Sequence, residues 1–86
     1  MPRLSEFYGI VIYMYFADHN PPHFHAIYGE HEALIAINDG AVIGGALPRT
    51  AAHLVEQWRE ERLHELVTNW DLAQVPLALS SIDPLR

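Results

Sequence analysis

Hydrophobic and polar positions alternate along the first half of the chain, and this alternation predicts β-strands. Residues 7–16 place Ile10 and Ile12 on one face and Val11 and Tyr13 on the other. Aromatic and β-branched residues with a two-residue period are typical of a strand. Because both faces are largely apolar, we expect this strand near the centre of a sheet. Similar patterns predict three more strands, over residues 23–28, 32–37 and 41–43.

Turn signals separate these strands. Asn38-Asp39-Gly40 is a strong hairpin signal, because glycine supplies the positive φ that a tight turn requires. Gly29-Glu30 closes the second strand, and Gly44-Gly45 is expected to end or bulge the fourth. Four strands with short connections favour an antiparallel meander.

The second half of the chain has a helical period. Pro48 suits a first helical turn, and two apolar stripes follow with a spacing of three and four residues. The stripes do not join smoothly across residues 59–62, so the pattern predicts either two short helices with a kink near Arg59 or one curved helix. His53 and His64 fall on the polar side. The two stripes are Ala51, Leu54, Val55 and Trp58, then Leu63, Leu66, Val67 and Trp70.

The predicted fold class is therefore α+β: a four-stranded, mainly antiparallel sheet with C-terminal helical segments packed on one face. Residues 1–86 form a single domain, since the chain has 86 residues. Residues 75–86 are expected to form an irregular tail or an added edge strand. A domain of this size buries only roughly 60–65% of its unfolded surface, so a partner subunit would stabilise it.

Charge and composition narrow the range of functions that the chain could have. The net charge is −6 and all five cations are arginines, so direct DNA binding is not expected. A small basic protein partner fits the charge better, with a homo-oligomer as the alternative. No apolar run reaches the ~18 residues of a membrane span, and the N-terminus does not resemble a signal peptide, so we expect a cytoplasmic protein. The absence of cysteine leaves histidine and carboxylate as the ligands for any metal.

The candidate chemistry is concentrated in Asp18-His19-Asn20-Pro21-Pro22-His23-Phe24-His25. Histidine is the side chain that titrates near neutrality and the commonest metal ligand. In a strand that begins at His23, the side chains of His23 and His25 share one face. His19 would have to return across the two prolines to join them. Asp18 could serve as a carboxylate ligand or orient an imidazole.

Three hypotheses remain open for this corner. In the first, the histidines bond to backbone groups and only fix the turn. In the second, His19, His23 and His25 bind a divalent metal such as zinc, although their spacing matches no diagnostic zinc motif. In the third, the same histidines act as acid and base with Asp18 as the orienting group, for example on a phosphodiester.

This segment, with Phe7-Tyr8-Gly9-Ile10-Val11-Ile12 before it and Gly45-x-Leu47-Pro48 and Asn69-Trp70 after it, closely resembles a small bacterial family called domain of unknown function 4160. The resemblance implies a short cytoplasmic protein, often encoded beside a second small domain in an arrangement similar to toxin–antitoxin pairs. It therefore favours a small interaction protein that acts through a protein partner. The alternatives are a weak histidine-dependent ribonuclease or phosphoester hydrolase, or a metal-binding module.

Overall fold

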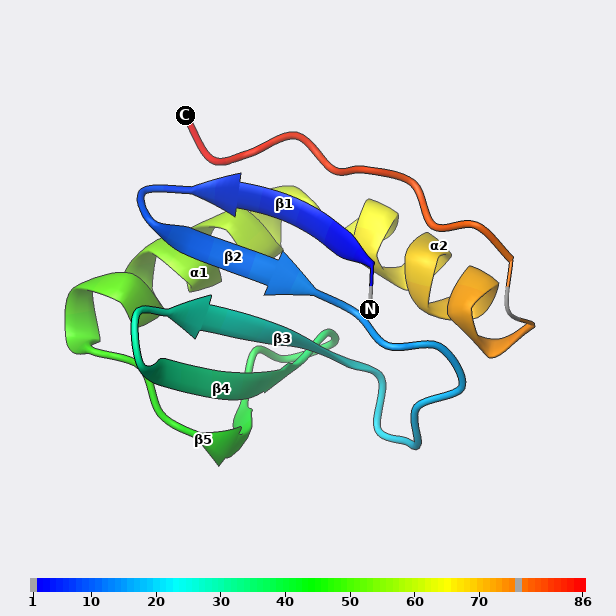
Figure 1. The fold of residues 1–86 in the computed structure, drawn as a ribbon, viewed down its shortest axis with the longest axis horizontal. Helices are drawn as coiled ribbons and strands as arrows, with labels where there is room; N and C mark the ends of the chain where they lie inside the picture. The colour runs from blue at the N-terminus through cyan, green and yellow to red at the C-terminus, as the bar shows by residue number, and fades with distance from the viewer. Residues whose placement is uncertain (1, 76) are drawn as a thin grey trace.

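Five short strands form one antiparallel sheet in the computed structural model, which describes residues 2–75 and 77–86. The strands lie side by side in chain order, and two helices follow them in the sequence. Both helices lie against the same face of the sheet (Figure 1). The α+β class is confirmed. The strands are β1 (Arg3–Phe7), β2 (Ile10–Tyr13), β3 (His23–Tyr28), β4 (His31–Ala36) and β5 (Val42–Gly45).

The number of strands differs from the four that the sequence predicts. The apolar run 7–16 is divided by a tight turn at Tyr8 and Gly9, whose φ angles are +51° and +79°. Two successive positive φ angles are typical of the type I′ turn that joins the strands of a hairpin. Because the residues before Phe7 are mixed in polarity, the alternation alone did not reveal β1.

The later strands follow the prediction more closely. β3 has the predicted bounds, and β4 begins and ends one residue earlier than expected. β5 continues through the two glycines that were expected to end or bulge it, and its pairing with β4 shifts register between Leu34 and Ile35. Gly45 has φ +68°, and a Cβ atom there would lie 2.0 Å from the carbonyl oxygen of Glu32. Only glycine allows β5 to approach β4 this closely.

The helical part contains two helices, α1 (Arg49–Glu61) and α2 (Leu63–Gln74), separated at Arg62 and not at Arg59. Arg59 remains helical, and its buried guanidinium donates a hydrogen bond to the Ile37 carbonyl, 2.8 Å away. Leu66 and Trp70 of the second predicted stripe are buried, but the inward face of α2 is shifted so that Leu63 and Val67 are exposed. The buried face of α2 consists of Leu66, Asn69, Trp70 and Ala73.

Within the described residues, neither helix is long and apolar enough to cross a membrane.

The core lies between the sheet and the two helices, with Trp58 of α1 at its centre. The Trp58 ring contacts Phe7 and Phe24, with ring centroids 5.4 and 5.8 Å apart. Its indole N–H donates to the Asp83 carbonyl oxygen at 2.9 Å. This one side chain therefore joins α1, two strands and the C-terminal segment.

The C-terminal segment is irregular, and no strand is formed by its described residues, 77–86. It runs beside β1 and across the helices (Figure 1), and the Ile82 N–H donates to the Leu4 carbonyl at 2.8 Å. Pro76, also part of the predicted tail, lies outside the described residues. Buried Asn69 fixes the segment further, because its carboxamide accepts from the Ser80 N–H at 2.7 Å and donates to the Ser80 carbonyl at 3.0 Å.

We expect Asn69→Ala to lower the free energy of unfolding by about 1–2 kcal/mol, because it removes both hydrogen bonds that hold the Ser80 backbone. Urea unfolding followed by tryptophan fluorescence measures the change. Thr68→Ala is the matched control: Thr68 is exposed and bonds only to its own helix, so its effect should stay within about 0.5 kcal/mol. Equal effects of the two variants would contradict the role given to Asn69.

Candidate functional site

The candidate site lies where the connection between β2 and β3 folds back over the sheet. Phe24 and Ala26 point into the core beneath the helices, so the alternating neighbours His23 and His25 point to the opposite face. The connection reaches that face through Ala17, which has φ +53° and donates its N–H to the Ala73 carbonyl of α2 at 3.0 Å. The peptide bond Asn20–Pro21 is cis.

This path places the Asp18 carboxylate beside both imidazoles. One carboxylate oxygen, Oδ2, is 3.0 Å from His23 Nε2 and 3.5 Å from His25 Nε2. One ligand atom from each of the three residues lies within 4.8 Å of the other two. Both histidines are buried and Asp18 is largely so. The structure therefore brings together three of the four residues that the sequence singles out.

The other ring nitrogen of each histidine is already engaged. His23 Nδ1 is 2.8 Å from the Pro21 carbonyl oxygen, and His25 Nδ1 is 3.1 Å from Glu32 Oε2. A carbonyl and an ionised carboxylate can only accept, so both Nδ1 atoms must carry the proton and donate. In a neutral imidazole this fixes the tautomer and leaves the lone pair on Nε2.

This fixed tautomer determines the electrostatics of the cluster. Two Nε2 lone pairs face a carboxylate oxygen that also has only lone pairs to offer. Such an arrangement needs a cation between its members, either a proton on each Nε2 or a metal ion. Among the described residues, His25 Nε2 has no hydrogen-bond partner, since its contact with Asp18 at 3.5 Å does not have hydrogen-bond geometry.

Aromatic rings limit the movement of the two imidazoles. Tyr15 packs edge-on against His25 with ring centroids 4.4 Å apart, and Trp70 of α2 lies 5.5 Å from His23. Above the cluster is an open groove of about 480 Å³. The groove makes the site reachable from solvent. It is lined by Asp18, His19, Asn20, Pro21, His23, His25, Leu34 and Ile43.

His19 lies at the rim of this groove and outside the three-residue cluster. Its side chain is 94% exposed, and its Nδ1 is 3.4 Å from Asp18 Oδ1, the carboxylate oxygen that faces away from the pair. Sequence reasoning grouped His19 with the other two and did not single out Glu32. A signal for Glu32 existed, because in an antiparallel pair a residue on β4 two positions from the partner of His25 lies on the same face.

Opposing effects act on the pKa of Asp18. Burial alone would raise it, but the His19 backbone N–H at 2.9 Å and the neighbouring imidazoles stabilise the carboxylate. The net result is a pKa below the ordinary value of 3.8. Asp18 is therefore an anion at neutral pH, as a cation ligand must be.

Comparison with known proteins shows the family of the chain. Residues 9–71 match the family model described as "Domain of unknown function (DUF4160)", so the chain belongs to that family. The match includes the whole site, from Asp18 to Glu32. No curated protein and no solved structure matches the chain.

The lowered pKa of Asp18 predicts how stability depends on pH. A carboxyl group whose pKa is lower in the folded state stabilises the fold above its unfolded pKa, and this contribution is lost as the pH falls through the folded pKa. In chelator-treated protein, wild type should therefore exceed Asp18→Asn in unfolding free energy at about pH 5, and the difference should shrink steadily below it. Urea unfolding at a series of pH values measures this. A difference that grows on acidification would contradict it.

Proposed function

We propose that this protein binds a divalent metal ion such as zinc through Asp18 Oδ2, His23 Nε2 and His25 Nε2. The observation that carries the proposal is the buried His25 Nε2, which has no hydrogen-bond partner within the described part of the chain yet lies beside the other two donors. If the site held only protons, the proton on this nitrogen would meet Asp18 Oδ2 only at 3.5 Å, outside hydrogen-bond geometry. A metal ion would use all three donors at once.

The distances support this donor set. At a metal–ligand distance of about 2.0–2.1 Å, tetrahedral geometry separates ligand atoms by roughly 3.3 Å. The two distances from Asp18 Oδ2, 3.0 and 3.5 Å, lie on either side of that value. The Nδ1 atoms donate to a carbonyl and a carboxylate, which are the groups that usually accept the second N–H of a metal-bound histidine.

Electrostatics also favour a cation. Asp18 and Glu32 bring two negative charges to the site, one as a ligand and one behind His25. Residues 4–48, which include every strand from β2 to β5, contain no lysine or arginine to compete for the carboxylates. A divalent ion would balance the two carboxylates.

An ion at this site would have three protein ligands and a position open to the groove. Such open sites are typical of catalytic zinc, which lowers the pKa of a bound water molecule and so supplies a nucleophile. Hydrolysis of a phosphoester, or of RNA, is the activity that we propose for the loaded site. His19 at the groove rim is the candidate proton donor or acceptor.

A protein partner is the second candidate function, and a different observation favours it. β5 is the last strand in the sheet order, and Val42 and Ile43 on it are large exposed apolar residues. A role in a toxin–antitoxin-like pair, which the resemblance implies, would use such a surface. That role stays a prediction.

Metal binding can be measured by titrating chelator-treated, tag-free protein with Zn²⁺ in a calorimeter. We expect one ion per chain, and we expect Asp18→Ala and His25→Ala to weaken binding by at least about tenfold. Glu32→Gln should weaken it by about tenfold, because Glu32 orients His25. The visible spectrum of bound Co²⁺ would report the coordination number independently of affinity.

His53→Ala is the matched control, since His53 is exposed on α1, and it should bind zinc like the wild type. Binding that depends on His19 as strongly as on His25 would show that the donor set is wrong. No uptake by the folded wild type would reject the metal and leave the two-proton arrangement of the corner.

Hydrolysis is tested separately with the zinc-loaded protein on a model phosphodiester and on RNA. His23→Ala should abolish turnover while the far-ultraviolet circular dichroism remains unchanged. His19→Ala should retain zinc but lose part of the rate, about tenfold or more for a positioned acid or base. No turnover by loaded wild type would remove the hydrolase and leave a binding module.

A further inference from the structure

The two edges of the sheet differ in how they are covered. At the β1 edge, the C-terminal segment lies alongside the strand and donates the Ile82 N–H to the Leu4 carbonyl (Figure 1). At the opposite edge, β5 pairs with β4 alone among the described strands. A strand with one free side presents unpaired N–H and C=O groups to which another extended segment can bond.

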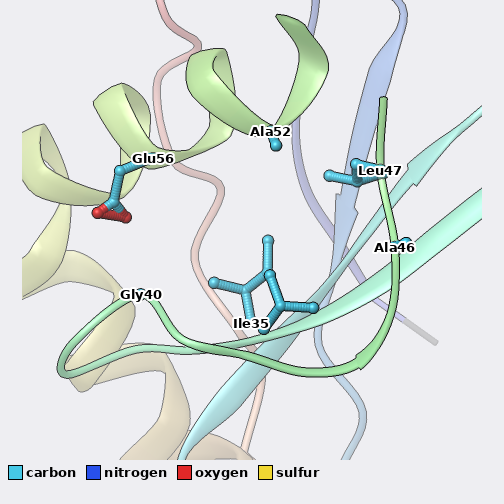
Figure 2. A pocket seen from close by; sticks show the side chains of 7 residues that line it. Ile35, Gly40, Ala46, Leu47, Ala52 and Glu56 are labelled. Carbon is cyan, nitrogen blue, oxygen red and sulfur yellow. The ribbon is translucent and has the colours of Figure 1, made fainter. Parts of the chain in front are cut away.

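Hollows flank the β5 edge on both faces of the sheet. Val42, which is 54% exposed, lines a cavity of about 530 Å³ between the sheet and α1. Figure 2 shows this cavity, with Ile35 pointing from the sheet toward Ala52 on α1 and Leu47 at one side. Ile43, which is 43% exposed, lines the groove above the histidines on the other face.

This arrangement matches the two-residue period of an extended chain. A strand added along β5 would send alternate side chains to opposite faces. One set would enter the apolar cavity, which has only Glu56 as a charged lining residue, and Glu56 is already paired with Arg59. The other set would lie over the groove that contains His25. The β5 edge would therefore contact side chains on both faces of one extended segment.

Charge indicates the nature of that segment. Residues 4–48 carry five carboxylates and no lysine or arginine. Two of the five lie close to the edge: exposed Asp39, which bonds to the Ala41 N–H, and Glu32, whose carbonyl accepts from the Ala46 N–H. A second copy of the chain would bring two acidic edges together. β5 is also short and bulged, which limits pairing between copies.

We propose that β5 is the docking edge for an extended, net-basic segment of a partner protein, which joins the sheet as a sixth strand and inserts apolar side chains into the cavity lined by Ile35, Val42, Leu47 and Ala52. The inference rests on the second candidate function, partner binding, and does not require a bound metal ion. It specifies the surface, the backbone conformation of the bound segment and its charge.

The test uses a display library of random peptides selected against the intact protein. Enriched peptides should carry lysine or arginine and alternate apolar residues, and their affinity should fall on addition of salt. Val42→Asp should weaken binding of the best peptide at least tenfold, as should Val42→Lys, which places a cation at the edge. Bound peptide should slow hydrogen exchange at residues 42–45. Val67→Asp, which alters an exposed apolar residue on α2, should leave the affinity unchanged.

Several outcomes would overturn the proposal: no enrichment by protein that is shown to be folded, acidic consensus peptides, or binding that both Val42 variants retain. Self-association of the wild type that Val42→Asp abolishes would assign the edge to a second copy and also overturn it. A natural partner whose binding is unchanged in both Val42 variants would preserve the second candidate function while rejecting this surface.

Discussion

The contact of the Asp18 carboxylate with two buried imidazoles is the constraint on which the geometry of the candidate site depends. One nitrogen of each imidazole already donates a hydrogen bond, from His23 to the Pro21 carbonyl and from His25 to the Glu32 carboxylate. The remaining nitrogens and Asp18 Oδ2 form a set of electron pairs with no donor among them unless protons or a metal ion are added. Burial of both imidazoles raises the cost of leaving these electron pairs without a partner.

The fold produces this set by using the two faces of one sheet differently. The helices cover one face and form the core with the side chains that alternate with the histidines. On the other face, the connection between β2 and β3 provides the cover. The Ala17 hydrogen bond anchors this connection to α2, and His23 at the start of β3 contacts Trp70 of the same helix. The site is therefore attached to both layers. An ion bound there would link the connection, β3 and, through Glu32, β4.

The predictable part of the site is the local part. Alternation along β3 is enough to place His23 and His25 on one face, and the structure agrees. The position of Asp18 depends on a backbone path through a positive φ at Ala17 and on a hydrogen bond to Ala73, far away in the sequence. No local pattern encodes that path. For the same reason, the sequence left open whether His19 returns across the two prolines to join the pair, and in the structure its side chain is exposed.

The errors in the fold have similar causes. β1 was not predicted because the division at Tyr8 and Gly9 lies inside an unbroken apolar run. The second stripe is only half buried, because α2 turns polar Asn69 inward with Leu66 and Trp70, and a pattern of apolar residues does not include an asparagine. The other four strands and the helical second half, which depend on the pattern of many residues at once, were predicted more closely.

The site and the open edge are connected through Ile43. This residue belongs to β5, yet its side chain lines the groove over the histidine cluster. A segment docked along β5 would therefore lie beside the coordination position that an ion held by Asp18, His23 and His25 would leave open. A bound segment could cover that position or contribute a ligand of its own. Because both surfaces lie in the acidic part of the chain, a metal ion and a basic segment would be attracted to neighbouring places by the same carboxylates. Occupancy of one would then alter the electrostatic attraction of the other, so that metal binding and partner binding would be coupled.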